Sequence, residues 1–191
     1  DWYFAVLEVA RSPRARGRLE GLLDGGSEIA GLRIDQDRRW ELIQALARAG
    51  APAIRERIAA ELEKDPTDMG RKAAIAAEAS LPSPETKAEW RVRIEAAPGP
   101  ESLADADLRE AMGSYHLLGQ EEISKQSIEW YFATLPGFAA TRDEDLVDDF
   151  SRAMFPALCD EQVVRRVDEL LGSGTKLPAA AARNLRVARQ E

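Results

Sequence analysis

Histidine and cysteine are almost absent from this sequence of 191 residues, which holds one of each, His116 and Cys159. A lone cysteine excludes an internal disulfide and permits a reducing, cytoplasmic compartment. An HExxH zinc site needs two histidines, and a tetrahedral His/Cys site needs four ligands where this chain offers two. The sequence therefore predicts no metal or cofactor bound by this chain, and structural roles for both residues, Cys159 as a small buried thiol and His116 as a surface or cap residue.

Long apolar runs and basic stripes are also missing. No apolar run approaches the roughly 20 residues of a membrane-spanning helix, so we expect no membrane partner. The net charge is −8, and residues 101–161 carry 14 acidic and 4 basic side chains. A cationic group such as a peptide amine would suit this acidic segment, although charges on predicted helices usually face solvent. Without a basic stripe, a nucleic-acid partner is not expected.

The common catalytic and ligand-binding motifs are absent. An EF-hand calcium loop beginning at Asp35 fails, because its fifth, sixth and twelfth positions hold Arg39, Trp40 and Leu46. Neither phosphate-binding glycine motif occurs, and there is no G-x-S-x-G elbow. Residue chemistry alone therefore indicates an interaction or structural domain without catalytic residues.

Helical periodicity runs along almost the whole chain, whereas alternation typical of strands is missing. Prolines stand where helices would begin, at Pro13, Pro52, Pro66, Pro84 and Pro178. Three of them follow a residue of the type that caps helix starts, Ser12, Asp65 and Ser83. About eleven helices are predicted, near 2–11, 13–24, 35–49, 52–64, 66–80, 84–96, 102–113, 119–134, 142–155, 160–172 and 178–189. Short helices with short connections favour antiparallel neighbours. We expect an all-α fold, an αα-superhelix of the HEAT or armadillo kind with irregular repeats, forming one domain over residues 1–191.

The predicted helix 119–134 is apolar on two sides. Ile128, Tyr131, Phe132 and Leu135 share one face, whereas Ile123 and Trp130 fall on nearly the opposite face. Two-sided packing within a helical stack is the favoured explanation. The alternative is that Trp130 and Ile123, together with Trp2 near the start of the chain, contact another domain.

The stretch "RIDQDRRW", residues 33–40, is dense in charge, but most of it is expected to start a helix. Asp35 is predicted as the N-cap, and Asp37 lies in the first turn, where the helix dipole favours an anion. Arg39 falls inside the apolar stripe, beside Trp40. We therefore predict that Arg39 is largely buried and paired with a carboxylate of a neighbouring helix.

Three stretches resemble a known family in order and spacing: "GLRIDQDRRWELIQALARAG", "AAELEKDPTDMGRKAAIAAEASLPSPETKAEW" and "EEISKQSIEWYFATLP". The shared motifs are D-x-D-x-R-W from Asp35, D-P-T-x-x-G from Asp65, K-x-x-W from Lys87, W-Y-F from Trp130 and F-P at Phe155. They resemble the C-terminal domain of actinobacterial aminopeptidase N, a zinc gluzincin. In this version the domain looks like that of endoplasmic-reticulum aminopeptidase.

The resemblance implies a helical superhelix that closes over a zinc-bearing catalytic domain and walls a cavity admitting peptides. The family's catalytic motifs, HExxH and G-x-M-E-N, lie upstream of this domain and are missing here. The resemblance therefore places zinc in the catalytic domain of a parent chain, with that domain and the parent's peptide substrates as partners. The missing initiator Met also suggests a piece of a longer chain. The alternative is a standalone HEAT-like adaptor that binds a protein partner.

Overall fold

The computed structural model describes Leu7 and residues 10–190. Helices make up the regular structure of these residues, with no strand among them, so the predicted all-α class is confirmed. The chain divides into two compact units, residues 1–87 and residues 88–191, which are described separately below. Trp2 and most of the helix predicted over 2–11 lie outside the described residues.

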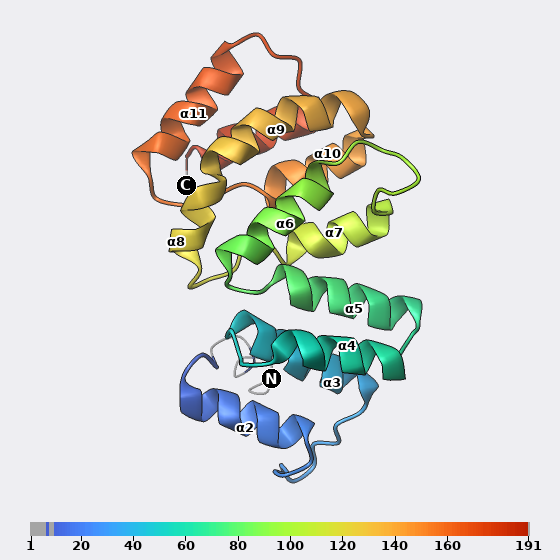
Figure 1. Ribbon diagram of the computed structural model, residues 1–191. Coiled ribbons are helices and arrows are strands. Elements are labelled where there is room, and N and C mark those ends of the chain that lie inside the picture. The colour runs from blue at the N-terminus through green and yellow to red at the C-terminus, as the bar shows by residue number, and fades with distance from the viewer. Residues whose placement is uncertain (1–6, 8–9, 191) are drawn as a thin grey trace. The chain divides into compact units, whose positions relative to one another are not determined.

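The first unit is built around α3 (Figure 1). Its helices are α2 (Pro13–Leu23), α3 (Gln36–Arg48), α4 (Ile54–Lys64) and α5 (Asp68–Ala79). Helix α3 packs against the other three, and α4 also packs against α5. Leu42, Leu46 and Ala47 of α3 are fully buried. The apolar stripe read from the sequence of α3 is therefore the centre of this core.

Side chains that cap helix starts explain where α2, α3 and α5 of the first unit begin, whereas α4 starts after Ala53 without a side-chain cap. Ser12 Oγ accepts from the Ala15 amide, and Asp35 Oδ1 accepts from the Arg38 amide at 3.1 Å, as predicted for both helices. The expectation that Asp65 caps the next helix is wrong. Thr67 is the N-cap of α5, while Asp65 follows the last residue of α4.

Helix α6 (Pro84–Glu95) begins in the first unit and ends in the second, with Ser83 Oγ accepting from the Thr86 amide at its start. The second unit then holds α7 (Asp105–Gly113), α8 (Glu121–Ser124), the 3₁₀ turn η1 (Lys125–Ser127), α9 (Ile128–Thr141), α10 (Glu144–Ala153), α11 (Glu161–Gly172) and α12 (Ala179–Ala188). Helix α10 packs against α7, α9 and α12, and α11 packs against α9 and α12. Helix-on-helix packing of this kind is what an αα-superhelix is built from.

The helix predicted over 119–134 differs from the structure at both ends. Its first part is the short α8 followed by a 3₁₀ turn, so Ile123 and Trp130 do not share one regular helix. Its second part, α9, continues through Pro136 to Thr141. Leu135 and Phe138, on either side of this proline, are 0% and 4% exposed. Their burial offsets the hydrogen bond that proline cannot make, which is why a typical stop signal failed to end the helix.

No helix within the described part of the chain is both long and apolar enough to span a membrane.

Candidate functional site

Arg39, among the charged residues at the start of α3, forms an ion pair inside the first unit. Arg39 donates two hydrogen bonds to the Glu61 carboxylate of α4, Nε to Oε1 at 2.6 Å and Nη2 to Oε2 at 2.7 Å. Glu61 is 2% exposed and Arg39 is 28% exposed. The predicted carboxylate partner is present, but Arg39 is half-buried rather than largely buried. Its guanidinium reaches the edge of the core, where Nη1 also donates to the Leu23 carbonyl.

The Glu61 carboxylate accepts further hydrogen bonds. Gln36 Nε2 donates to Oε1 at 3.0 Å, and Lys64 Nζ lies 3.2 Å from Oε2. Hydrogen bonding from Arg39, helped by Gln36 and Lys64, outweighs desolvation and lowers the pKa of Glu61 from 4.5 to about 2. The same contact raises the pKa of the Arg39 guanidinium. Both charges are therefore fixed across the physiological range, which suits a structural pair and not an acid–base catalyst.

Trp40, the neighbour of Arg39, makes the second polar contact between α3 and the end of α4. Its indole Nε1 donates to Asp65 Oδ2 at 2.9 Å, while its ring is 5% exposed. Thr67 Oγ1 donates to Asp65 Oδ1 at 2.7 Å and accepts from the Gly70 amide. The D-P-T-x-x-G motif thus forms the joint between α4 and α5, and Trp40 holds it against α3.

Gly70 is required at this joint by close approach of the chain. A Cβ placed on Gly70 would overlap the Asp65 carbonyl oxygen and lie 2.7 Å from the Asp65 carboxyl carbon. Real Cβ atoms do not occupy such positions, so any larger residue must push Asp65 away from Trp40 and Thr67.

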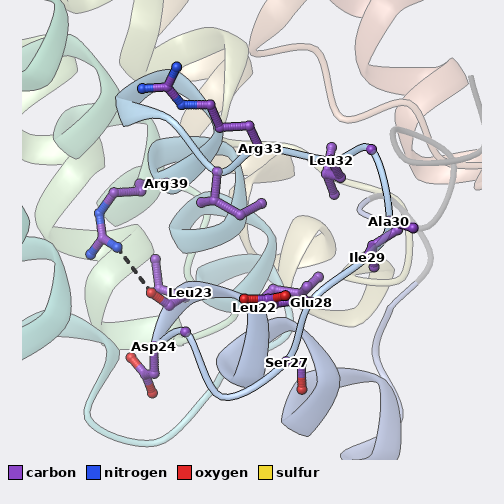
Figure 2. Close-up of a pocket in the computed structure, with 13 residues that line it drawn as sticks. Leu22, Leu23, Asp24, Ser27, Glu28, Ile29, Ala30, Leu32, Arg33 and Arg39 are labelled. Atoms are coloured by element: carbon purple, nitrogen blue, oxygen red, sulfur yellow. Dashed lines mark hydrogen bonds between the residues drawn. The ribbon is translucent and has the colours of Figure 1, made fainter.

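A cavity of about 660 Å³ opens beside Arg39 (Figure 2). The end of α2 and the loop over residues 24–34 form most of its wall, with Arg39 on one side. Figure 2 shows the Arg39 guanidinium bonded to the Leu23 carbonyl at the cavity edge. The carboxylate of Asp24, which also lines the cavity, is held by Arg57 through contacts of 2.7 and 3.0 Å. The charged groups of Arg39 and Asp24 are therefore already engaged in the fold, while the exposed Glu28 and Arg33 also line the cavity.

Lys87 of the K-x-x-W motif is a buried lysine, 2% exposed, whose Nζ donates to the Ala79 carbonyl at 2.6 Å. Ala79 is the last residue of α5, where carbonyls have no partner within the helix. Burial lowers the pKa of Lys87 to about 7. Trp90, from the same motif, is buried beneath the Arg93 guanidinium, which lies 4.0 Å from the ring centroid.

The candidate interface residues of the second unit are partly covered within that unit. Trp130 Nε1 donates to Glu95 Oε2 at 2.6 Å, and its ring lies against Tyr115 and Phe150. Ile123 of α8 is half-buried. These contacts support the packing explanation for Trp130, and the role of Trp130 and Ile123 at a domain interface stays a prediction. The third candidate, Trp2, lies outside the described residues.

His116 and Cys159 have separate surroundings. His116 Nδ1 lies 3.0 Å from Ser124 Oγ, and Nε2 lies 3.2 Å from the Met154 carbonyl oxygen, so the ring joins two segments of the second unit. Cys159 is exposed, so the expectation of a buried thiol is wrong. Among the described residues, no three His, Cys, Asp or Glu side chains gather as a metal ion would require.

All-helical units held by a buried ion pair and by capped helix ends define a helical structural or binding domain. A model of the ERAP1-like C-terminal domain family matches residues 6–191, and the chain belongs to that family. Aminopeptidase N from Streptomyces lividans is 32% identical over 186 residues. That alignment covers 96% of this chain and 21% of the relative, so the chain spans about a fifth of that protein's length.

Glu61 is the important residue that sequence reasoning missed. It follows Ile54 and Ile58 at helical spacing, so it occupies the stripe that these two buried isoleucines define. A carboxylate at such a position needs a cationic partner. Together with Arg39 in the stripe of the preceding helix, this was a signal for the pair.

We expect acid to remove the stabilisation that Glu61 provides. A carboxylate with a lowered pKa stabilises the fold above its ordinary pKa of 4.5, and this contribution is lost as pH falls towards 2. Between pH 5 and pH 2 the unfolding free energy should lose about 3 kcal/mol through this group. In Glu61→Gln that loss should be missing, as urea unfolding at several pH values would measure. Asp24→Asn, which breaks the exposed pair with Arg57, is the control and should change stability by less than about 1 kcal/mol.

Gly70→Ala should destabilise the first unit by about 3 kcal/mol, because the added methyl displaces Asp65 from Trp40 and Thr67. Thermal unfolding followed by circular dichroism would measure the change. Gly17→Ala is the matched control, since nothing lies within 4 Å of its Cβ position in α2. That substitution should stabilise the helix by up to about 1 kcal/mol. Equal effects of the two substitutions would contradict the steric role of Gly70.

Proposed function

We propose that this chain is the non-catalytic C-terminal domain of a zinc aminopeptidase of the cytoplasm. It closes the substrate cavity over the catalytic domain of its parent chain and restricts access to peptides. The observation that carries the proposal is the match to aminopeptidase N, which covers nearly all of this chain and a fifth of the relative. A domain of this size in so long a relative leaves room for a separate catalytic domain.

The residues of this chain support separate roles for this domain and for the catalytic domain of the parent chain. Zinc would be bound by the parent's catalytic domain, since one histidine cannot provide the two of an HExxH motif. Arg39 and Glu61 of the first unit are engaged in joining α3 to α4. A rigid helical wall is the contribution that such a domain makes to a closed cavity. Trp130, Ile123 and Trp2 are the candidates for contact with the catalytic domain.

The isolated chain should not hydrolyse aminoacyl chromogenic substrates, with or without added zinc, because it lacks the HExxH and G-x-M-E-N motifs. Release of the chromophore, followed by absorbance, is the measurement. Zinc-dependent turnover by the pure chain, abolished by a chelator, would contradict the proposal.

Access to the cavity is tested in the parent enzyme, with and without this domain. The shortened enzyme should gain activity on the N-terminus of a folded protein relative to a short peptide, as mass spectrometry of the products would show. Its zinc content and its activity on an aminoacyl chromogenic substrate control for folding of the catalytic domain. If the ratio of the two activities stays unchanged while zinc is retained, the domain does not restrict access.

A standalone HEAT-like adaptor is the alternative. The coding sequence upstream distinguishes the two, since a reading frame with HExxH and a downstream Glu belongs to the aminopeptidase alone.

A further inference from the structure

The second unit contains a cavity of about 700 Å³ between the end of α10, the link over residues 154–160, and helices α11 and α12. Its apolar lining includes Phe155, Leu158, Val163, Val164, Val167 and Ala188. Val163 and Val167 are buried, whereas Val164 is 40% exposed, so the apolar surface continues from the core to solvent. This volume lies within the range of sites that bind small molecules.

The positive charges at the cavity are already neutralised. Arg152 lies 2.8 Å from Asp148 Oδ2 and 2.9 Å from Asp149 Oδ1. Arg189 donates to both carboxylate oxygens of Asp168. Each guanidinium therefore lies beside an aspartate charge, which weakens its attraction for an anionic ligand.

Apart from Ser151, Gln190 and the Cys159 thiol, the polar groups that remain at the cavity are acceptors and negative charges. Asp160 is the N-cap of α11, where Oδ1 accepts from the Gln162 amide. Glu161 is exposed and has no ion pair or hydrogen bond among the described residues. The amide nitrogen of Asn184 donates to Asp148 and Ser151, which leaves its carbonyl oxygen as an acceptor. The nearby cation Lys125 is paired with Glu122 at 2.8 Å.

We propose that this cavity binds a hydrophobic primary amine. The apolar body of the ligand packs on Phe155 and the valines of α11, and its ammonium group lies at the mouth beside Asp160 and Glu161. Three N–H donors of an ammonium match the carboxylate and carbonyl acceptors that the mouth offers. This site does not depend on the function proposed for the whole domain.

Cys159 lines the same cavity and is the only cysteine of the chain, so its modification reports occupancy. The rate at which a neutral maleimide modifies Cys159 would be measured with phenylbutylamine, phenylbutanol and phenylbutyrate, which share one apolar body. The amine should protect Cys159 at concentrations about fivefold to tenfold lower than the alcohol, because two exposed ion pairs add modestly to the apolar contact. The acid should protect least.

Two double variants test whether the preference for the amine comes from the carboxylates at the cavity mouth or from negative charge elsewhere on the surface. Asp160→Asn with Glu161→Gln removes both charges while asparagine keeps the N-cap, and the advantage of the amine over the alcohol should disappear. Asp143→Asn with Glu144→Gln changes the equivalent pair at the start of α10, which does not line the cavity, and the advantage should persist. Ala188→Phe fills the cavity and should abolish protection by all three compounds.

Two results on the unaltered chain would overturn the proposal without any variant. These are an amine that gives no protection, and an amine that protects no better than the alcohol. An advantage of the amine that survives Asp160→Asn with Glu161→Gln would also overturn it. Far-ultraviolet circular dichroism and direct calorimetric titration of each variant verify that the fold is kept and that protection reflects binding.

Discussion

The charge of Glu61 inside the first unit is the constraint on which the packing of that unit depends. A carboxylate at 2% exposure costs several kcal/mol unless its oxygens are fully engaged. Arg39, Gln36 and Lys64 supply those donors from α3 and α4. The two helices must therefore meet where these donors reach the carboxylate.

Trp40 makes this position unique. Arg39 and Trp40 are adjacent on α3, and their acceptors Glu61 and Asp65 stand one helical turn apart at the end of α4. A slip of α3 by one turn, about 5.4 Å, would leave both a buried charge of the ion pair and the Trp40 indole N–H without hydrogen-bond partners. Most of the buried apolar residues of α5 are alanine, which fixes the position of a helix weakly. The polar pair thus provides specificity that small side chains cannot.

Local features of the fold were predictable from sequence, and features that depend on distant partners were not. The caps at Ser12, Asp35 and Ser83 follow from short-range preferences. The presence of a partner for Arg39 followed from its place in an apolar stripe, but its identity needed the fold, because Glu61 is 22 residues away. The helix end predicted at residue 134 was wrong for the same reason, since burial of Leu135 and Phe138 in the core of the second unit lets α9 continue through Pro136.

The contacts around Gly70 explain which positions of the D-P-T-x-x-G motif are specified. Three of its four specified residues, Asp65, Thr67 and Gly70, bond or touch at the junction of α4 and α5, while the fourth, Pro66, is exposed. The two unspecified letters, Asp68 and Met69, face solvent, with Met69 70% exposed. The motif therefore specifies mainly the residues that make contacts, and it leaves unspecified two residues that face solvent. A chain that builds this joint must carry glycine there, whatever chemistry its other domains perform.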